Sequence, residues 1–152
     1  VRFMGDLEDP RIPPVLLDRI ADAEALTRDN TTMNMVFAFN YGGRSEIVDA
    51  MKRIAAKVAD GQMTPDSIGL DTVASHLYIP EMPDPDVVIR TSGEQRTSNY
   101  LLWEAAYSEY VFTPVLWPDF DRSELARCVA EYQARDRRFG GAVDGSLDGS
   151  EG

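Results

Sequence analysis

Two arginines and a run of hydroxyl side chains follow a short apolar segment in the second half of the sequence. Arg90 comes directly after Val87–Ile89, and Arg96, Thr97 and Ser98 come shortly behind it. A guanidinium group presents paired N–H donors that match the oxygen pairs of a phosphate, and hydroxyl groups add further donors. Each hydrogen bond to a charged group contributes about 1.5–3 kcal/mol net. This combination of residues predicts a site for a phosphate or diphosphate.

The elements expected around these side chains would bring them to one place. Val87–Ile89 predicts a buried strand, and residues 98–109 predict an amphipathic helix with a hydroxyl residue at its start. In an open α/β sheet, ligands bind beyond the carboxyl ends of the strands, and helix N-termini attract anions. The alternative is that Arg90 and Arg96 pair with nearby carboxylates on a solvated surface. Spacing alone leaves both interpretations open.

The pattern of apolar runs and breakers predicts an α/β protein whose mostly parallel sheet is flanked by helices. The expected strands span residues 1–4, 33–39, 87–89 and 110–112, and the expected helices span residues 15–28, 45–60, 71–78 and 121–137. Helical periodicity predicts which side chains of the second and fourth helices face inward. These are Ile47, Met51, Ile54, Ala55 and Val58 in the second helix, and Leu125, Val129 and Tyr132 in the fourth.

A second glycine-containing turn joins the strand at 33–39 to the helix at 45–60. It reads Asn40-Tyr-Gly-Gly-Arg44, and Ser45 is a candidate N-cap for the helix. A double-glycine turn is a weak phosphate signal, because glycine also serves backbone geometry alone.

Seven segments, in the same chain order, resemble the cis-prenyltransferases, the family of undecaprenyl and decaprenyl diphosphate synthases. The strongest match is Arg90-Thr-Ser-Gly-Glu-Gln-Arg-Thr-Ser-Asn99, and together the matches cover most of the chain. The other matching segments are Arg2–Asp6, Phe39–Ile47, Leu101–Trp103, Tyr107–Glu109, Leu116–Phe120 and Arg137–Gly141.

This resemblance implies an enzyme that condenses isopentenyl diphosphate onto an allylic diphosphate such as farnesyl diphosphate. Each cycle adds a cis double bond, and Mg²⁺ assists departure of the allylic diphosphate. The product would be a polyprenyl diphosphate of the undecaprenyl or decaprenyl type, used as a lipid carrier in cell-wall synthesis. By resemblance, the residues that bind the diphosphate of isopentenyl diphosphate are Arg90, Arg96, Thr97 and Ser98. Asn40, Gly42, Gly43 and Arg44 would form the floor of the site or support it.

Glu109 is the residue that the resemblance associates with the metal. On a continuous helix the eleven residues after Ser98 would rise about 16 Å, so Glu109 would not reach the same diphosphate through its own helix. It would act from a partner subunit or support the fold. Many family members carry a histidine metal ligand where this chain has Gln95, and glutamine is a poor substitute at a hard-cation site.

Arg138 and Gly140 resemble an Arg-x-Gly element that reaches into the partner subunit's site in this family. The resemblance therefore implies a homodimer. Alternatively, Arg138 is a cation favoured at a helix C-terminus and Gly140 is a C-cap. Both interpretations can hold together.

The Asp-Gly-Asn motif that carries the family's magnesium-binding aspartate does not occur in this sequence. We therefore expect a C-terminal portion of such an enzyme, without the N-terminal elements of the fold. We place no catalytic residue in it and expect the isolated chain to be inactive. A non-catalytic partner subunit of a heteromeric enzyme is the alternative. Such partners usually lose the diphosphate-binding arginines, which are present here.

The composition of the 152 residues predicts a single domain over residues 1–141 and an acidic tail rich in glycine and serine over 142–152. The net charge of −11 argues against nucleic acid as the main partner. A single cysteine, Cys128, excludes an intrachain disulfide, indicates a reducing compartment and is expected to be a core residue. We expect a cytoplasmic protein. Peripheral membrane contact through a lipid product is compatible with this location.

Overall fold

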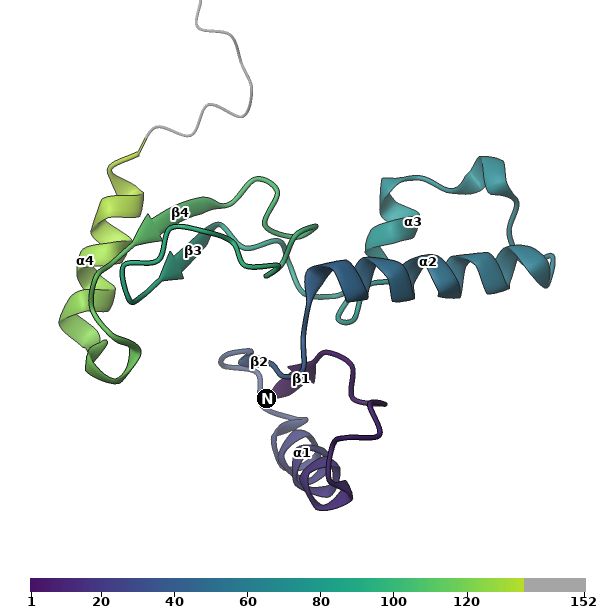
Figure 1. Cartoon of the computed structure of the whole chain (residues 1–152), viewed down its shortest axis with the longest axis horizontal. Coiled ribbons are helices and arrows are strands. Elements are labelled where there is room, and N and C mark those ends of the chain that lie inside the picture. Colours follow the sequence, from purple (N-terminus) through teal and green to yellow (C-terminus); the bar gives the residue numbers. More distant parts are fainter. Residues whose placement is uncertain (136–152) are drawn as a thin grey trace, which may run out of the picture. The chain divides into compact units, whose positions relative to one another are not determined.

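The computed structural model describes residues 1–135, and these residues form two compact units. The first unit comprises Val1–Pro85 and Arg96–Ala106, and the second comprises Asp86–Gln95 and the chain from Tyr107 onward. Figure 1 labels the helices and strands of both units.

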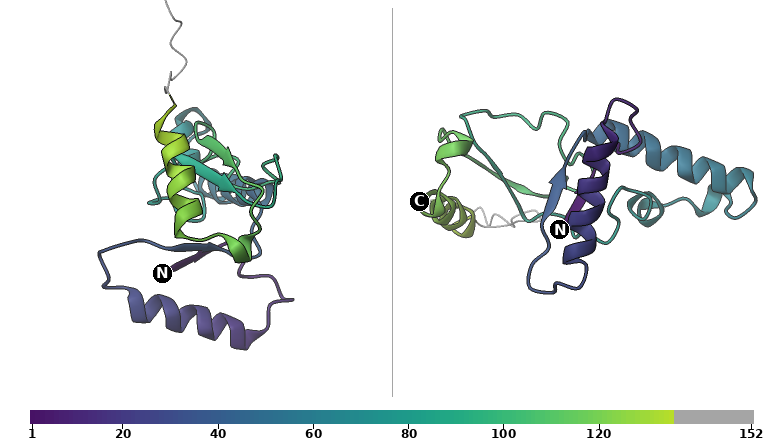
Figure 2. Two further views of the ribbon diagram at one scale, coloured as in Figure 1. Left: turned by 90° about the vertical axis from the view of Figure 1, so that its left-hand side faces the viewer. Right: turned by 90° about the horizontal axis from the view of Figure 1, so that it is seen from below.

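The first unit is built on a pair of parallel strands joined through a helix. Strand β1 pairs with β2 in the register Arg2–Val36 to Met4–Ala38, and helix α1 packs against β1 (Figure 2). Parallel pairing of the first two strands agrees with the sequence prediction. The elements of this unit are β1 (Arg2–Met4), α1 (Pro14–Thr27), β2 (Val36–Ala38), α2 (Gly43–Ala59), the 3₁₀ turn η1 (Pro65–Ser67) and α3 (Leu70–Ala74).

Helix α2 buries a face that agrees only in part with the predicted one. Ile54 is buried as predicted, and Ala50 and Glu46, the latter at 1% exposure, are buried with it. Met51, which was predicted to face inward, is 60% exposed. The prediction was wrong for Met51, because hydropathy assigns a carboxylate such as Glu46 to the surface and therefore rotates the expected stripe around the helix.

The second unit also contains one pair of parallel strands. Strand β3 pairs with β4 in the register Val87–Glu109 to Arg90–Phe112, and α4 packs against β4. The elements are β3 (Val87–Arg90), β4 (Glu109–Phe112), the 3₁₀ turn η2 (Trp117–Asp119) and α4 (Arg122–Gln133). Within residues 1–135 the predicted parallel sheet thus takes the form of two two-stranded parallel sheets, one in each unit.

Helix α4 starts as predicted and buries its cysteine. The Asp121 carboxylate accepts a hydrogen bond from the Glu124 N–H at 2.9 Å, which caps the helix. Cys128 is fully buried, so its assignment to the core is confirmed, and burial raises the pKa of its thiol. Leu125 and Val129 were predicted to face inward but are 45% and 36% exposed.

The helix predicted over residues 98–109 is absent from the structure. Residues 98–107 form turns and a bend, and Glu109 is the first residue of β4. Ser98, Asn99 and Leu101 have φ angles of 49°, 65° and 46°, in the left-handed region that a right-handed helix excludes. The expected 16 Å separation along one helix therefore does not apply to Glu109. Among the described residues, no helix combines the length and the apolar character needed to cross a bilayer.

Candidate functional site

The loops that follow β1 and β2 are fastened to each other at the carboxyl ends of these strands. Asn40 donates from Nδ2 to the Asp6 carbonyl at 2.8 Å, and the Asp6 N–H donates to the Asn40 carbonyl at 3.2 Å. Gly5 makes this approach possible: it has a φ of 141°, and a Cβ there would lie 1.9 Å from the Phe39 carbonyl oxygen. Asn40 therefore supports the loop geometry through its side chain.

The Asp9 carboxylate completes this arrangement. It accepts hydrogen bonds from Arg11 and, at 3.2 Å, from Asn40 Nδ2. The Arg11 side chain holds the pKa of Asp9 well below its usual range. The carboxylate is thus already engaged by donors within the chain.

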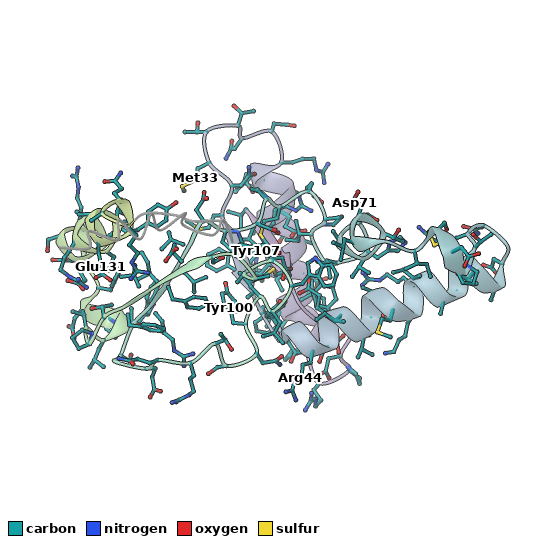
Figure 3. All side chains as sticks on the ribbon, turned by 90° about the horizontal axis from the view of Figure 1, so that it is seen from above. Met33, Arg44, Asp71, Tyr100, Tyr107 and Glu131 are labelled. Atoms are coloured by element: carbon teal, nitrogen blue, oxygen red, sulfur yellow. The ribbon has the colours of Figure 1, made fainter. Side chains whose placement is uncertain are left out.

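The turn at Gly42 and Gly43 is joined to Asn99 from far along the sequence. The Gly43 N–H donates to the Asn99 carbonyl at 2.7 Å, and the Arg44 N–H donates to Asn99 Oδ1 at 2.9 Å. Gly42 is the N-cap residue of α2 and provides no side-chain cap. Asn99 therefore engages the first two amides of the helix, while the Arg44 side chain stands exposed at the helix start (Figure 3).

Sequence reasoning quoted Asn99 only as part of a motif and assigned it no role. The sequence predicted Ser45 as the N-cap, but α2 begins at Gly43 and its N-cap is Gly42. A glycine N-cap leaves the first helical amides without a side-chain acceptor, and this is the signal that could have found Asn99. Such a helix requires an acceptor from elsewhere in the chain, and an asparagine in a matching motif is a natural candidate.

Arg96, Thr97 and Ser98 lie in the turn that leads to Asn99. All three are exposed, and the Tyr100 N–H donates to the Thr97 carbonyl at 3.1 Å. No helix starts at this turn, so the expected contribution of helix-start amides is wrong here. That the side chains of Arg96, Thr97 and Ser98 bind phosphate stays a prediction.

Arg90 is the last residue of β3, at the carboxyl end of this strand, and is half-buried. Its carbonyl accepts the Thr113 N–H at 2.9 Å, which extends the pairing with the chain after β4. Arg90 belongs to the second unit, whereas Arg96 and Ser98 belong to the first. The convergence of these residues on one diphosphate stays a prediction.

Glu109 forms an ion pair that joins β4 to the end of α4. Arg135 Nη1 lies 2.8 Å from Glu109 Oε2, and Nη2 of the same guanidinium lies 2.8 Å from Glu131 Oε1. These two carboxylates raise the pKa of Arg135. Within residues 1–135, no group of three or more His, Cys, Asp or Glu residues is arranged to hold a metal ion. Arg138, Gly140 and the segment 142–152 lie outside the described residues.

Two buried carboxyl groups form a cluster that the sequence analysis did not single out. Glu46 accepts from the Tyr41 hydroxyl at 2.5 Å and from the Tyr78 N–H at 2.9 Å. Glu104 is 5% exposed, and its Oε2 has no hydrogen-bond partner within the described chain. Burial, and then the nearby Glu46 charge, raise the pKa of Glu104 to about 7. Glu104 is therefore partly protonated near neutral pH, where an ordinary glutamate is ionised.

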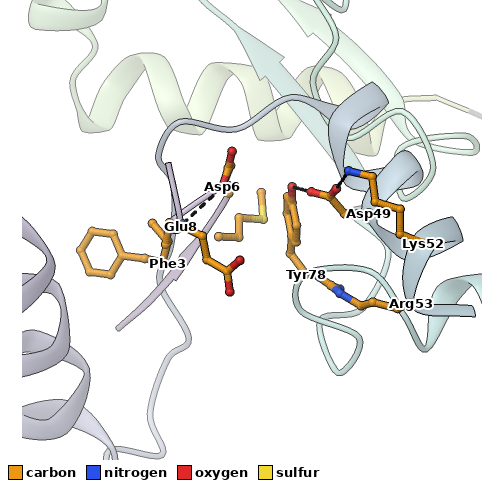
Figure 4. A pocket seen from close by; sticks show the side chains of 10 residues that line it. Phe3, Asp6, Glu8, Asp49, Lys52, Arg53 and Tyr78 are labelled. Carbon is orange, nitrogen blue, oxygen red and sulfur yellow. Dashed lines mark hydrogen bonds and ion pairs between the residues drawn. The ribbon is translucent and has the colours of Figure 1, made fainter. Parts of the chain in front are cut away.

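An open cavity of about 570 Å³ lies between the β1 exit loop and α2 (Figure 4). Asp6 and Glu8 line one side, and the cations on the other side are already engaged. Lys52 Nζ is 2.9 Å from Asp49, and the Arg53 guanidinium stacks over the Tyr78 ring and donates to the His76 carbonyl. None of the predicted diphosphate-binding residues lines this cavity.

Comparison with known proteins identifies the class to which this chain belongs. The family model described as "Putative undecaprenyl diphosphate synthase" matches residues 1–140. The chain is 54% identical over 122 residues to isoprenyl transferase 2 of Bradyrhizobium diazoefficiens, covering 80% of this chain and 48% of that protein. It is 45% identical over 142 residues to decaprenyl diphosphate synthase of Mycobacterium tuberculosis, covering 93% and 47%.

Solved structures give the same result for the fold. Lavandulyl diphosphate synthase from Lavandula x intermedia, in complex with dimethylallyl diphosphate, has a TM-score of 0.88 at 42% identity, covering 92% of this chain and 59% of that one. A probable undecaprenyl diphosphate synthase from Campylobacter jejuni has a TM-score of 0.78 at 29% identity, covering 92% and 62%. The chain belongs to the undecaprenyl diphosphate synthase family of prenyltransferases. It spans about half the length of the curated relatives that it matches.

Proposed function

We propose that the protein carrying this chain elongates a cis-prenyl chain by condensing isopentenyl diphosphate onto an allylic diphosphate such as farnesyl diphosphate. The observation that carries this proposal is the family match over residues 1–140, which includes the segment with Arg90, Arg96 and Ser98. Relatives named isoprenyl transferase and decaprenyl diphosphate synthase support it. The product is a polyprenyl diphosphate of the undecaprenyl or decaprenyl type, which would serve as a lipid carrier for cell-wall synthesis.

In this reaction the double bond of isopentenyl diphosphate attacks the allylic carbon, and the carbon–oxygen bond to the leaving diphosphate breaks. A proton is then lost from the new chain. We assign Arg90, Arg96, Thr97 and Ser98 to the diphosphate of isopentenyl diphosphate, which they hold without reacting with it. Guanidinium forks fix the orientation of a diphosphate, and correct orientation of two reactants lowers the barrier by several kcal/mol, up to about 7–11.

Family resemblance implies magnesium as the cofactor, because Mg²⁺ would neutralise the negative charge of the departing diphosphate. The described residues do not provide a site for it by themselves. Glu109 is held by Arg135, and no group of three or more candidate ligands occurs within residues 1–135. We therefore derive no step through the metal from this chain.

We further propose a homodimer in which Arg138 and Gly140 act at the partner's site, as family resemblance implies. We assign the enzyme to the cytoplasm, with peripheral membrane contact through its lipid product. Sedimentation of the purified protein and fractionation of cells into membrane and supernatant pools test these two assignments separately.

The direct test is product analysis with the protein encoded by the complete gene. Incubation with farnesyl diphosphate, labelled isopentenyl diphosphate and Mg²⁺ should give polyprenyl diphosphates, identified by mass, whose new double bonds are cis. Arg90→Ala should raise the KM for isopentenyl diphosphate and lower kcat, because both binding and orientation of this substrate are lost. Trans products, or no incorporation of label by the folded protein, would refute the proposed reaction. Unchanged kinetics of the variant would remove Arg90 from the site.

A further inference from the structure

Asn99 provides from a distant loop the cap that helix α2 lacks. Its carbonyl and its Oδ1 accept hydrogen bonds from the amides of Gly43 and Arg44, at 2.7 and 2.9 Å. The N-cap residue itself, Gly42, is extended at φ −157° and ψ 127° and contributes no side chain. Two of the four amides left over at a helix start are therefore satisfied by a single residue 55 positions away.

The same residue fixes an unusual backbone conformation. Ser98 and Asn99 have φ angles of 49° and 65°, in the left-handed region that few non-glycine residues adopt, asparagine more readily than serine. The contacts of Asn99 with α2 hold this turn, together with the hydrogen bond from the Tyr100 N–H to the Thr97 carbonyl. Ser98, directly before it, and Thr97 present their side chains from this constrained backbone.

Close packing restricts the arrangement further. A Cβ on Gly42 would meet Asn99 Nδ2 at 2.7 Å, and a Cβ on Gly43 would meet Leu102 Cγ at 2.9 Å. The two glycines of the Gly-Gly turn thus leave room for the 99–102 turn to rest against α2. The Gly-Gly turn and the turn at 99–102 are consequently packed against each other within the first unit.

We propose that Asn99 is a positioning residue for isopentenyl diphosphate, which orients Arg96, Thr97 and Ser98 by anchoring their turn to the start of α2. This inference rests on the proposed function, because it requires these side chains to bind the diphosphate. Asn99 fixes the direction in which these three side chains point. It does not contact the substrate.

The test separates positioning from helix stability with two variants of the protein encoded by the complete gene. Asn99→Ala removes the side-chain cap, which is the Oδ1 half of the anchor, and leaves the backbone bond from the Gly43 N–H to the carbonyl of residue 99 available. It should raise the KM for isopentenyl diphosphate by at least about tenfold and lower Tm by about 2–4 °C. The double variant Gly42→Ser/Asn99→Ala gives α2 a local hydroxyl cap and, without Asn99 Nδ2, has room for the new side chain. It should recover Tm while KM stays high.

Two controls accompany these variants. Gly69→Ser adds a hydroxyl at another glycine N-cap, that of α3, where a Cβ meets nothing within 4 Å, and it should leave KM unchanged. The KM for the allylic diphosphate should change by less than about twofold in Asn99→Ala, because positioning acts on one substrate only.

Each outcome has a defined meaning. If KM recovers together with Tm in the double variant, Asn99 acts through stability alone and the inference is wrong. If Arg96→Ala raises KM but Asn99→Ala does not, the inference is also wrong while the proposed function stands. If Arg96→Ala leaves KM unchanged, the assignment of the diphosphate-binding residues is wrong instead.

Discussion

Glu104 should make the protein less stable as pH rises from weakly acidic to neutral. An ordinary glutamate loses its proton near pH 4.5, as Glu104 does in the unfolded chain, but in the fold burial and the Glu46 charge raise its pKa to about 7. Between these values the folded protein holds a proton that the unfolded chain has released. Stability therefore falls with rising pH, by at most about 1.4 kcal/mol per pH unit for one proton.

The expected magnitude follows from this slope. Coupling to Glu46 reduces the effect below its upper limit, so we expect the free energy of unfolding to fall by about 1–2 kcal/mol between pH 5 and pH 7. Carboxyls with lowered pKa values, such as Asp49 and Glu124, give their stability up only below the ordinary carboxyl range, outside this window. Glu104→Gln replaces the acid with a neutral group of the same shape and should remove most of the fall.

Urea unfolding at several pH values, followed by circular dichroism, measures the effect. Glu8→Gln is the matched control, because Glu8 is an exposed glutamate and the same change there should preserve the wild-type pH profile. The reasoning is refuted if the wild-type protein is as stable at pH 7 as at pH 5. It is equally refuted if Glu104→Gln shows the same fall as the wild type.

Two further predictions concern the strand exits and the last helix. Gly5→Ala should destabilise the protein by at least about 2 kcal/mol, because a Cβ would lie 1.9 Å from the Phe39 carbonyl oxygen at a φ of 141°; urea unfolding with the same m-value would show it, and wild-type stability would contradict it. Asp121→Ala should lower Tm by about 2–4 °C, because it removes the N-cap of α4. Asp121→Asn should lower Tm by much less, because asparagine can also cap a helix. Differential scanning calorimetry measures both changes.

Much of the fold could be predicted because local signals and tertiary context agree. The segment Val87–Ile89 forms most of β3, and the strand expected at residues 110–112 forms β4. Asp121 precedes α4 and caps it, as a carboxylate before a helical pattern suggests. Parallel pairing followed from the alternation of strands and helices.

The turn at 98–107 could not be predicted, because its apolar residues imitate a helical period. Leu101 and Ala105 are four residues apart and both buried, as on a helix face. The backbone at Ser98 and Asn99 is instead left-handed, and Asn99 contacts the start of α2, which lies more than fifty residues earlier in the chain. A local pattern holds no information about such a partner.

The candidate site shows the same division between local and distant information. Residue types alone predicted phosphate binding at Arg90 and Arg96, because the match between a guanidinium group and a phosphate depends on the side chain itself. The buried state of Glu46 depends instead on the Tyr41 hydroxyl and the Tyr78 amide, which the fold brings to it. The anchoring contacts of Asn99 are likewise a product of tertiary structure.

The burial of Cys128 has a practical consequence for solution experiments. It is the single cysteine of the sequence, it is fully buried, and its raised pKa keeps the thiol protonated at neutral pH. Maleimide reagents attack the thiolate at accessible positions and should leave this residue unmodified in the native protein. Within this chain, a thiol introduced on an exposed loop can therefore be labelled selectively without first replacing Cys128.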